Sequence, residues 1–294
     1  MTFTIHITEL SPGSRAMAGA LLGRHSVSLT HMPKPQWPKL VAVIATVSLS
    51  AADHPEAPAI GKYLTRPTFR WTCEGNSTFR FCCPPGFESV VMDVKGGARQ
   101  SLAKTLRLAG TSTYTAKPLI YIFVLESEGR LRELIHVGAY GASEPKDHAV
   151  FFVWSHPEAL THELNHEVLT TLWGPAEQWI AEGFAAYAAE PAVDMQCRTI
   201  FDNHGYLPLA NMVDPAWTAS MYPASKIYPE LGSFVKYLHQ TYGIARLRQV
   251  WHRGSRSIPR VFGKPLLQLE HEWQASLYPV IDPASIPARP RARR

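Results

Sequence analysis

One short segment, residues 162–166, restricts what this chain can fold into. It reads His162-Glu163-Leu164-Asn165-His166. In a helix of 3.6 residues per turn, side chains four positions apart lie on one face, so the two histidines can ligate a single metal ion. Glu163 lies beside the first histidine, where its carboxylate can act on water at that metal. The segment therefore predicts a helix that carries part of a metal site.

The residues around this segment favour a helix. Ser155 can cap its first turn, with Glu158 completing a capping box and Pro157 tolerated at the start. The run 173–175, Trp-Gly-Pro, ends it. Between these limits apolar residues recur at helical spacing, which gives the helix a face to bury: Leu160, Leu164, Val168 and Leu172.

A second helix is predicted over residues 176–189, closed by Pro191. Glu182 lies inside it, in an otherwise apolar and alanine-rich run. A buried carboxylate without a partner is costly, so a cation beside Glu182 would explain its position.

The two segments together resemble a known enzyme clan. His-Glu-x-x-His, followed on the next helix by Trp-x-x-Glu-Gly-Phe-Ala-x-Tyr at residues 179–187, is similar to the gluzincin metallopeptidases, the clan of thermolysin and the aminopeptidase-N-like enzymes. The peptidase MA-like domains are the most similar. The resemblance implies His162, His166 and Glu182 as zinc ligands, with Glu163 as the general base. Fifteen residues separate the second histidine from Glu182, a shorter spacer than in the large aminopeptidases.

Weaker segments extend the resemblance from about residue 60 to about residue 278. They resemble, in order, two strands of the family domain, the helix after the ligand glutamate and the closing helix: residues 77–86, 118–124, 228–243 and 262–273. We therefore expect a peptidase MA-like gluzincin domain over residues 53–278.

The order of the predicted elements gives the fold class. Strand-like runs come first, at residues 68–73, 78–83, 119–125 and 149–154, with a helix expected over 98–109; helices dominate after residue 155. We expect an α+β fold with a small N-terminal mixed sheet packed on the helix that carries His162, and a mainly helical C-terminal half. By resemblance this is a thermolysin-like zincin catalytic domain. Hydrophobic residues make up 46% of the chain, enough for a substantial core.

The first 52 residues read as an N-terminal extension. An apolar run at residues 41–49 follows Lys34 and Lys39 and precedes small residues, so a chain started at Met32 would begin with a secretory signal. Export to the periplasm or beyond the cell is then expected, with a mature chain starting near Asp53. If residues 40–52 are instead a core strand, the protein is cytoplasmic. The run is too short to be a stable membrane span.

The net positive charge of the chain comes mostly from its last residues. The formal net charge is +5, and four arginines fall in the Pro- and Ala-rich tail, residues 279–294, which is predicted to be disordered: Arg289, Arg291, Arg293 and Arg294. This distribution does not predict a nucleic-acid groove, and we expect no nucleic-acid partner.

The four cysteines allow a disulfide without requiring one. Cys73 and Cys82 flank a predicted hairpin turned at residues 74–77 and can face each other, whereas Cys83 would point to the other face. Cys197 has no evident partner. Cysteine ligation of zinc is disfavoured because the chain contains no Cys-x-x-Cys.

Further residues concern catalysis and substrate. By resemblance Tyr228 is the candidate donor to the oxyanion, with Tyr222 second; a tyrosine of the core is the alternative. Residues 137–141 are interpreted as an edge strand and turn along which a peptide or protein substrate binds in extended form, and Glu144 as a solvated loop acid. Endopeptidase and exopeptidase activity both remain open.

The sequence thus predicts a zinc-dependent metallopeptidase. Two alternatives stay open: a non-catalytic binding module that keeps the gluzincin scaffold, and a zinc hydrolase of a non-peptide amide or ester. The intact Glu163 favours catalysis over the first of these.

Overall fold

The computed structural model describes residues 58–114, 119–216 and 223–278. The chain divides into two compact units, Met1–Val47 and Ser48–Arg294, and all described residues belong to the second. The predicted signal at residues 41–49, the candidate Tyr222 and the tail at residues 279–294 lie outside the described residues.

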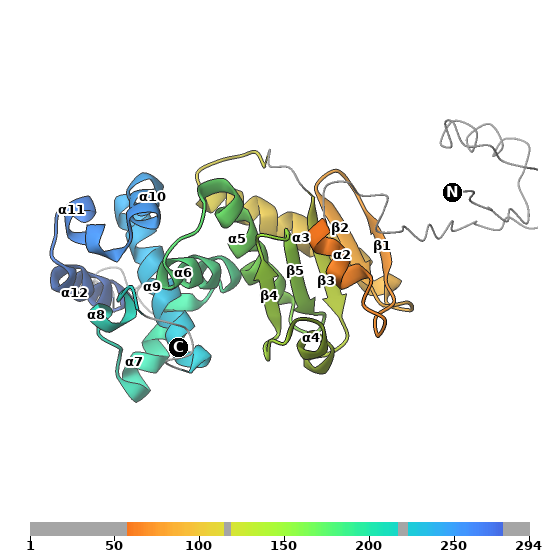
Figure 1. The fold of residues 1–294 in the computed structure, drawn as a ribbon. Coiled ribbons are helices and arrows are strands. Elements are labelled where there is room, and N and C mark those ends of the chain that lie inside the picture. Colours follow the sequence, from red (N-terminus) through yellow and green to blue (C-terminus); the bar gives the residue numbers. More distant parts are fainter. Residues whose placement is uncertain (1–57, 115–118, 217–222, 279–294) are drawn as a thin grey trace, which may run out of the picture. The chain divides into compact units, whose positions relative to one another are not determined.

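The first half of the described chain forms one mixed sheet with flanking helices (Figure 1). The strand order is β1-β2-β3-β5-β4; β2, β3 and β5 are parallel, and β1 and β4 pair antiparallel at the two edges. The elements are α2 (Pro58–Leu64), β1 (Thr72–Gly75), β2 (Phe79–Cys83), α3 (Glu88–Leu108), β3 (Ile120–Leu125), α4 (Glu128–Ile135), β4 (Gly141–Glu144) and β5 (Ala149–Val153).

The centre of the sheet is buried on both faces, which explains why β3 and β5 are apolar throughout instead of alternating. On one face, Ile122 and Phe152 belong to a cluster built with α3 and the following helix, α5 (Pro157–Trp173). On the other face, Phe123 and Phe151 pack against α2 and α4. The long helix α5 therefore rests on the sheet.

The second half is helical and has its own core. Its central helix is α9, which packs extensively on α6 and also on α7. The core is rich in large aromatic side chains, among them Trp179, Phe234 and Trp273. The remaining elements are α6 (Gln178–Ala189), α7 (Val193–His204), α8 (Leu209–Met212), α9 (Ala224–Tyr242), α10 (Ile244–Arg253), η3 (Ser255–Ser257), α11 (Ile258–Phe262) and α12 (Leu266–Leu277).

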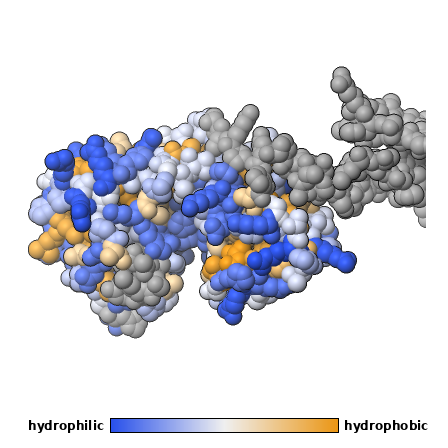
Figure 2. All heavy atoms as spheres, viewed as in Figure 1, coloured by the Kyte–Doolittle hydropathy of each residue, from blue (hydrophilic) through white to orange (hydrophobic). Residues whose placement is uncertain are grey.

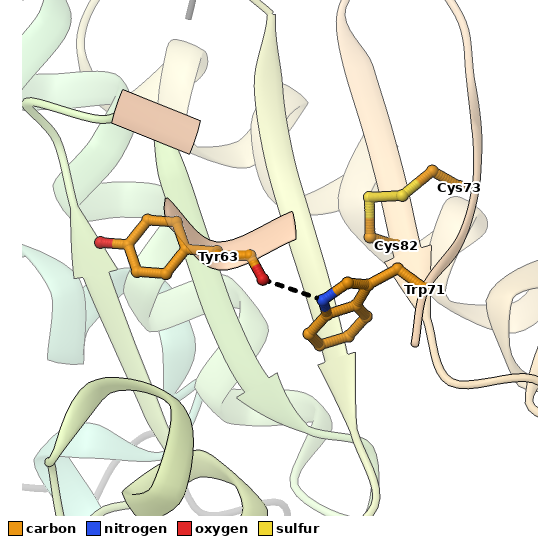
Figure 3. Close-up of a disulfide and its surroundings, with 4 residues drawn as sticks. All are labelled: Tyr63, Trp71, Cys73 and Cys82. Atoms are coloured by element: carbon orange, nitrogen blue, oxygen red, sulfur yellow. Dashed lines mark hydrogen bonds between the residues drawn. A yellow bond between two sulfur atoms is a disulfide. The ribbon is translucent and has the colours of Figure 1, made fainter. Parts of the chain in front are cut away.

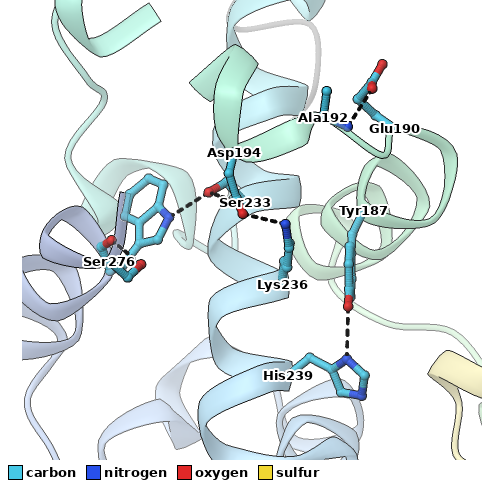
Figure 4. Close-up of polar contacts among 9 residues, drawn as sticks. Tyr187, Glu190, Ala192, Asp194, Ser233, Lys236, His239 and Ser276 are labelled. Atoms are coloured by element: carbon cyan, nitrogen blue, oxygen red, sulfur yellow. Dashed lines mark hydrogen bonds and ion pairs between the residues drawn. The ribbon is translucent and has the colours of Figure 1, made fainter. Parts of the chain in front are cut away.

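Polar contacts tie three of these helices together (Figure 4). Ser233 on α9 donates a hydrogen bond of 2.9 Å to Asp194 on α7 and accepts one of 3.0 Å from the indole of Trp273 on α12. Lys236 forms an ion pair with the same aspartate. Because buried polar groups must be paired, this network fixes the three helices in register.

A disulfide links β1 to β2 (Figure 3). Cys73 and Cys82 are cross-strand partners with Cα atoms 4.2 Å apart. The sequence had left this bond open; the turn itself lies at residues 76–78, where the Asn76 side chain accepts two backbone N–H groups. Beside the disulfide the Trp71 indole donates to the Tyr63 carbonyl at 3.1 Å, so the hairpin is held to α2. Cys83 and Cys197 are buried free thiols.

The α+β class and the order of sheet and helices agree with the sequence prediction, but several boundaries were wrong. The helix expected over residues 98–109 starts ten residues earlier, at Glu88, because Val91 and Val94 bury an apolar face ahead of two glycines. The helix expected from residue 176 starts at Gln178. None of the described helices is both long enough and apolar enough to cross a membrane.

The capping box at the start of α5 is also wrong. The residue before the helix is His156, which makes no capping bond with its side chain. Its imidazole instead stacks on the Tyr140 ring, with centroids 3.7 Å apart, and its Nδ1 lies 3.1 Å from a Glu158 oxygen. Glu158 is therefore engaged by His156 and does not form a capping box with Ser155.

Candidate metal centre

The candidate centre is built by one helical hairpin, α5 and α6. Gly174 ends α5 with φ of 80°, a conformation in which a Cβ would be strained. The Glu177 carboxylate in the following turn accepts a hydrogen bond from the Trp179 indole of α6 at 2.9 Å and, from outside the hairpin, one from the Ser255 backbone at 2.7 Å. A short linkage returns α6 along α5, which brings Glu182 opposite the histidines.

Three ligand atoms converge between these helices. The Nε2 atom of His162 lies 3.1 Å from the Nε2 atom of His166 and 3.1 Å from a Glu182 oxygen, and that oxygen lies 3.4 Å from the His166 Nε2 atom. A tetrahedral ion with ligands at about 2.0–2.1 Å requires ligand atoms about 3.3 Å apart. The three atoms are therefore spaced as such an ion needs them.

The electrostatics of this cluster favour added positive charge. Burial alone would raise the pKa of Glu182, but hydrogen bonds to His162 and His166 outweigh it and hold the pKa far below its ordinary value. Burial would likewise lower the pKa of His166, yet Glu182 and Glu163 raise it. Two carboxylates thus stabilise a cation at the point where the imidazole nitrogens meet. The cluster is the group of described His, Cys, Asp and Glu side chains that could hold a metal ion.

Glu163 lies between the histidines and the edge of the sheet. A Cβ built on Gly141 would lie only 2.9 Å from the Glu163 Cγ atom, so the strand backbone passes directly beside this carboxylate. Burial raises the pKa of Glu163, and the nearby histidines and a hydrogen bond with Ser143 partly offset the rise. The absence of a side chain at Gly141 is what allows this approach.

The strand beside Glu163 is β4, and it differs from the sequence interpretation. The strand was expected over residues 137–141, whereas it runs from Gly141 to Glu144; the expected range lies ahead of it. Glu144 is the last residue of the strand, not a loop residue, and it is exposed. The position of β4 follows from the tight turn at residues 145–148, in which His148 has a positive φ of 51°. This turn sets the register between β4 and β5.

Tyr228 comes from α9 and lies against His162, the first histidine of the pair. Its ring centroid is 5.5 Å from that of His162. Burial, followed by the charges of Glu182 and Glu163, raises the pKa of its phenol well above the ordinary value. The hydroxyl is therefore protonated at neutral pH and able to donate a hydrogen bond.

Of the six candidate residues named from the sequence, Tyr222 lies outside the described residues, and the other five lie around one point: His162, Glu163, His166, Glu182 and Tyr228. Sequence reasoning missed the contacts of Gly141 and Ser143 with Glu163. A glycine next to a strand-like turn was a signal for close backbone approach, but the partner lies 22 residues away and the short strand has no apolar alternation to fix its register.

Comparisons with known proteins add no assignment. The sequence matches no protein-family model, and no curated protein matches it.

Proposed function

We propose that this protein is a zinc-dependent metallopeptidase with a thermolysin-like catalytic domain. The observation that carries the proposal is the convergence of two imidazole nitrogens and one carboxylate oxygen, all within 3.4 Å, beside a further glutamate and an edge strand. The resemblance of the two helical segments to gluzincins supports the same reading.

The donor set suits zinc. His162, His166 and Glu182 would hold the ion, and two histidines with one carboxylate are a ligand set of catalytic zinc sites that keeps a further coordination position open. Side chains only 13–15% exposed keep such an ion in a partly dehydrated environment that solvent can still reach. When bound, zinc supplies Lewis-acid chemistry that polarises a carbonyl and acidifies water.

The protein's own residues have separate tasks in this proposal. Glu163 takes a proton from the attacking water and returns it to the leaving nitrogen, because its carboxylate lies beside the ligands without being one of them. The protonated Tyr228 hydroxyl donates a hydrogen bond to the oxyanion that forms on the substrate.

The substrate in this proposal is an extended peptide. Among the described strands, β4 pairs only with β5, at the end of the sheet order, and so its other backbone edge can pair with an added strand. In Figure 1 it is the strand drawn nearest the helical half, and Figure 2 shows the surface indented between the two halves. A peptide on this edge would pass Glu163 next to Gly141.

Export of the protein is part of the proposal. The Cys73–Cys82 disulfide supports an oxidising compartment, because such bonds are rare in reducing cytosol. Secretion with removal of the residues before Asp53 fits this expectation.

The decisive experiment measures zinc content and hydrolysis of a broad peptide library in the same preparations. The wild-type protein should hold about one zinc and cleave peptides, and His166→Ala should lose the metal. His239→Ala, on α9 and paired with Tyr187 (Figure 4), is the matched histidine control and should keep it. Full zinc stoichiometry in His166→Ala would overturn the site.

Glu163→Gln separates chemistry from binding. It should keep zinc but lose on the order of 10²-fold or more in turnover, because the general base is removed. Glu158→Gln, an exposed glutamate of the same helix, should leave turnover unchanged. A zinc-loaded wild-type protein that cleaves no peptide would point instead to a binding module, or, if amides or esters are cleaved, to a non-peptide hydrolase.

A further inference from the structure

A second concave site lies on the other side of α5, between α3, the first turns of α5 and the end of α6. It is a groove of about 870 Å³, within the range of small-molecule sites. Its lining is mainly apolar, with Val94, Leu160 and Ala188 as examples. None of the five candidate catalytic or ligand residues lines it. Whatever binds there is distinct from the metal centre.

Two of the helices that form the groove, α3 and α5, run side by side, and the residues that pair across them keep a constant difference in residue number. The Ser101 hydroxyl meets the Thr161 hydroxyl at 2.7 Å, and one turn later the Asn165 amide donates to Thr105 at 3.3 Å. Both pairs are sixty residues apart, which means that α3 and α5 are parallel. Positions along the groove can therefore be read from positions along α3.

Gly97 lines this groove, and its lack of a side chain leaves space there. A mid-helix glycine is unfavourable compared with alanine, so a packing reason is expected for it. A Cβ at Gly97 would make only an ordinary contact of 3.7 Å with Leu160, and one at the neighbouring Gly96 would touch nothing within 4 Å. No described neighbour requires either glycine. Only Gly97 lines the groove, so its missing side chain leaves room in the groove and nowhere else.

Charge is separated along the groove. Two carboxylates, Asp93 and Glu158, line it ahead of the Ser101–Thr161 contact, on the side of the exposed Trp154. Lys104 and Arg107 line the other end, three and six residues after Ser101 along α3. Neither cation forms an ion pair within the described residues, although Glu190 acts on Lys104 electrostatically. Burial lowers the pKa of Lys104, as expected for a cation partly removed from water without a close anion.

We propose that this groove binds an amphipathic anion, an alkyl chain with a carboxylate or phosphate head, with the head at Lys104 and Arg107 and the chain running over Gly97 toward Trp154. From Val94 to Lys104 is ten residues, about 15 Å along a helix. Because the carbon–carbon bonds, each about 1.5 Å long, zigzag along an extended alkyl chain, a chain of about twelve carbons spans this length.

An alkyl chain fits the walls better than a peptide does. The walls are mostly helices, and their backbone groups are used within those helices. An extended peptide in the groove would leave its own N–H and C=O groups unpaired, and unpaired buried amides are costly. An alkyl chain carries no such groups, and its one charged end meets the two cations.

The test uses the full chain and titration calorimetry with dodecanoate, dodecyl phosphate and dodecyltrimethylammonium, all below their micelle concentrations. Dodecanoate or dodecyl phosphate should bind with one-to-one stoichiometry, and the tighter of the two identifies the head group. Dodecyltrimethylammonium, which has the same tail and the opposite charge, should bind at least tenfold more weakly. Equal affinity for both charges would reduce the groove to a non-specific apolar surface and overturn the proposal.

Matched variants locate the site. Lys104→Glu should raise the dissociation constant of the anion at least tenfold, whereas Arg99→Glu, the same charge change on the same helix outside this groove, should change it less than twofold. Gly97→Ala should weaken binding about threefold or more while Gly96→Ala leaves it unchanged, with both proteins at least as heat-stable as wild type. No saturable binding, or equal losses in the matched pairs, would refute the assignment.

Discussion

Tyr228 is the residue whose proposed role can be separated most cleanly from metal binding, because its ring lies against His162 while its hydroxyl is no ligand. Tyr228→Phe should keep zinc and substrate affinity but lower kcat about 10²- to 10³-fold, the usual loss when one oxyanion donor is removed. Steady-state kinetics on a peptide substrate measure this. Tyr187→Phe, a half-buried tyrosine of α6, is the control. A kcat within twofold of wild type would contradict this role and favour the alternative that Tyr228 is only a core tyrosine.

Glu230 is a buried acid of α9, and only one of its two carboxylate oxygens has a hydrogen-bond partner among the described residues. Its side chain is 0% exposed; one oxygen accepts the Leu207 N–H at 2.9 Å, and the other has no hydrogen-bond partner. Burial raises its pKa from 4.5 to about 7, against the lowering effects of that bond and of the Lys226 charge. Between pH 4.5 and about 7, Glu230 therefore keeps a proton in the folded protein that it has already released in the unfolded chain.

The sign of this linkage gives a prediction. Because the native state binds the extra proton, the free energy of unfolding should fall as pH rises from 4.5 to about 7, by roughly 3 kcal/mol in all. Glu230→Gln keeps the Leu207 bond and cannot ionise. It should match wild type near pH 5 and exceed it at pH 8, as measured by urea unfolding at both values. Parallel pH profiles for the two proteins would contradict the assignment.

The contact between α6 and α9 is the element-scale feature on which the proposed metal centre depends. A Cβ at Gly183, next to the proposed ligand Glu182, would lie 2.5 Å from a Val235 methyl and 2.9 Å from the Leu231 carbonyl oxygen. A backbone atom cannot move aside as a side chain can. The glycine therefore sets how closely the two helices approach.

Gly183→Ala should separate these helices. We expect a loss of about 1–3 kcal/mol in the free energy of unfolding from overpacking, together with weaker zinc binding because Glu182 shifts with α6. Chemical unfolding and competition with a zinc chelator measure the two effects. Gly96→Ala on α3, where the new Cβ meets nothing, should instead be neutral or stabilising. If both variants behave alike, the close helix approach is not what positions the ligand.

Elements with strong local signals could be predicted from the sequence, and those decided by distant contacts could not. The run 149–153 was predictable because an apolar stretch between turn residues has few alternatives. The cap of α5 was not, since Tyr140, sixteen residues earlier, stacks on His156 and changes the local choice. The candidate site followed the same division: two candidate ligands share one helix and were evident from their spacing, whereas Ser143 reaches Glu163 only through sheet register.

At the scale of the whole molecule, the division of the chain after Val47 bears on its N-terminus. A protein that begins at Asp53 retains nearly all of the second unit, including every described strand and helix. Its melting temperature should therefore match that of the full chain. If residues 41–49 supply a core strand, several buried aliphatic side chains would be lost at about 1.5–3 kcal/mol each. A collapse of the melting temperature would count against the signal interpretation.

The three candidate ligand atoms all come from a span of 21 residues, His162 to Glu182, within one helical hairpin. Closing so short a loop costs little chain entropy, and contacts this local form early during folding. A cation bound there, as proposed, would join two elements that are already neighbours along the chain and would not bridge the sheet to the distant helices. Its removal would loosen a hairpin and leave the architecture around it standing.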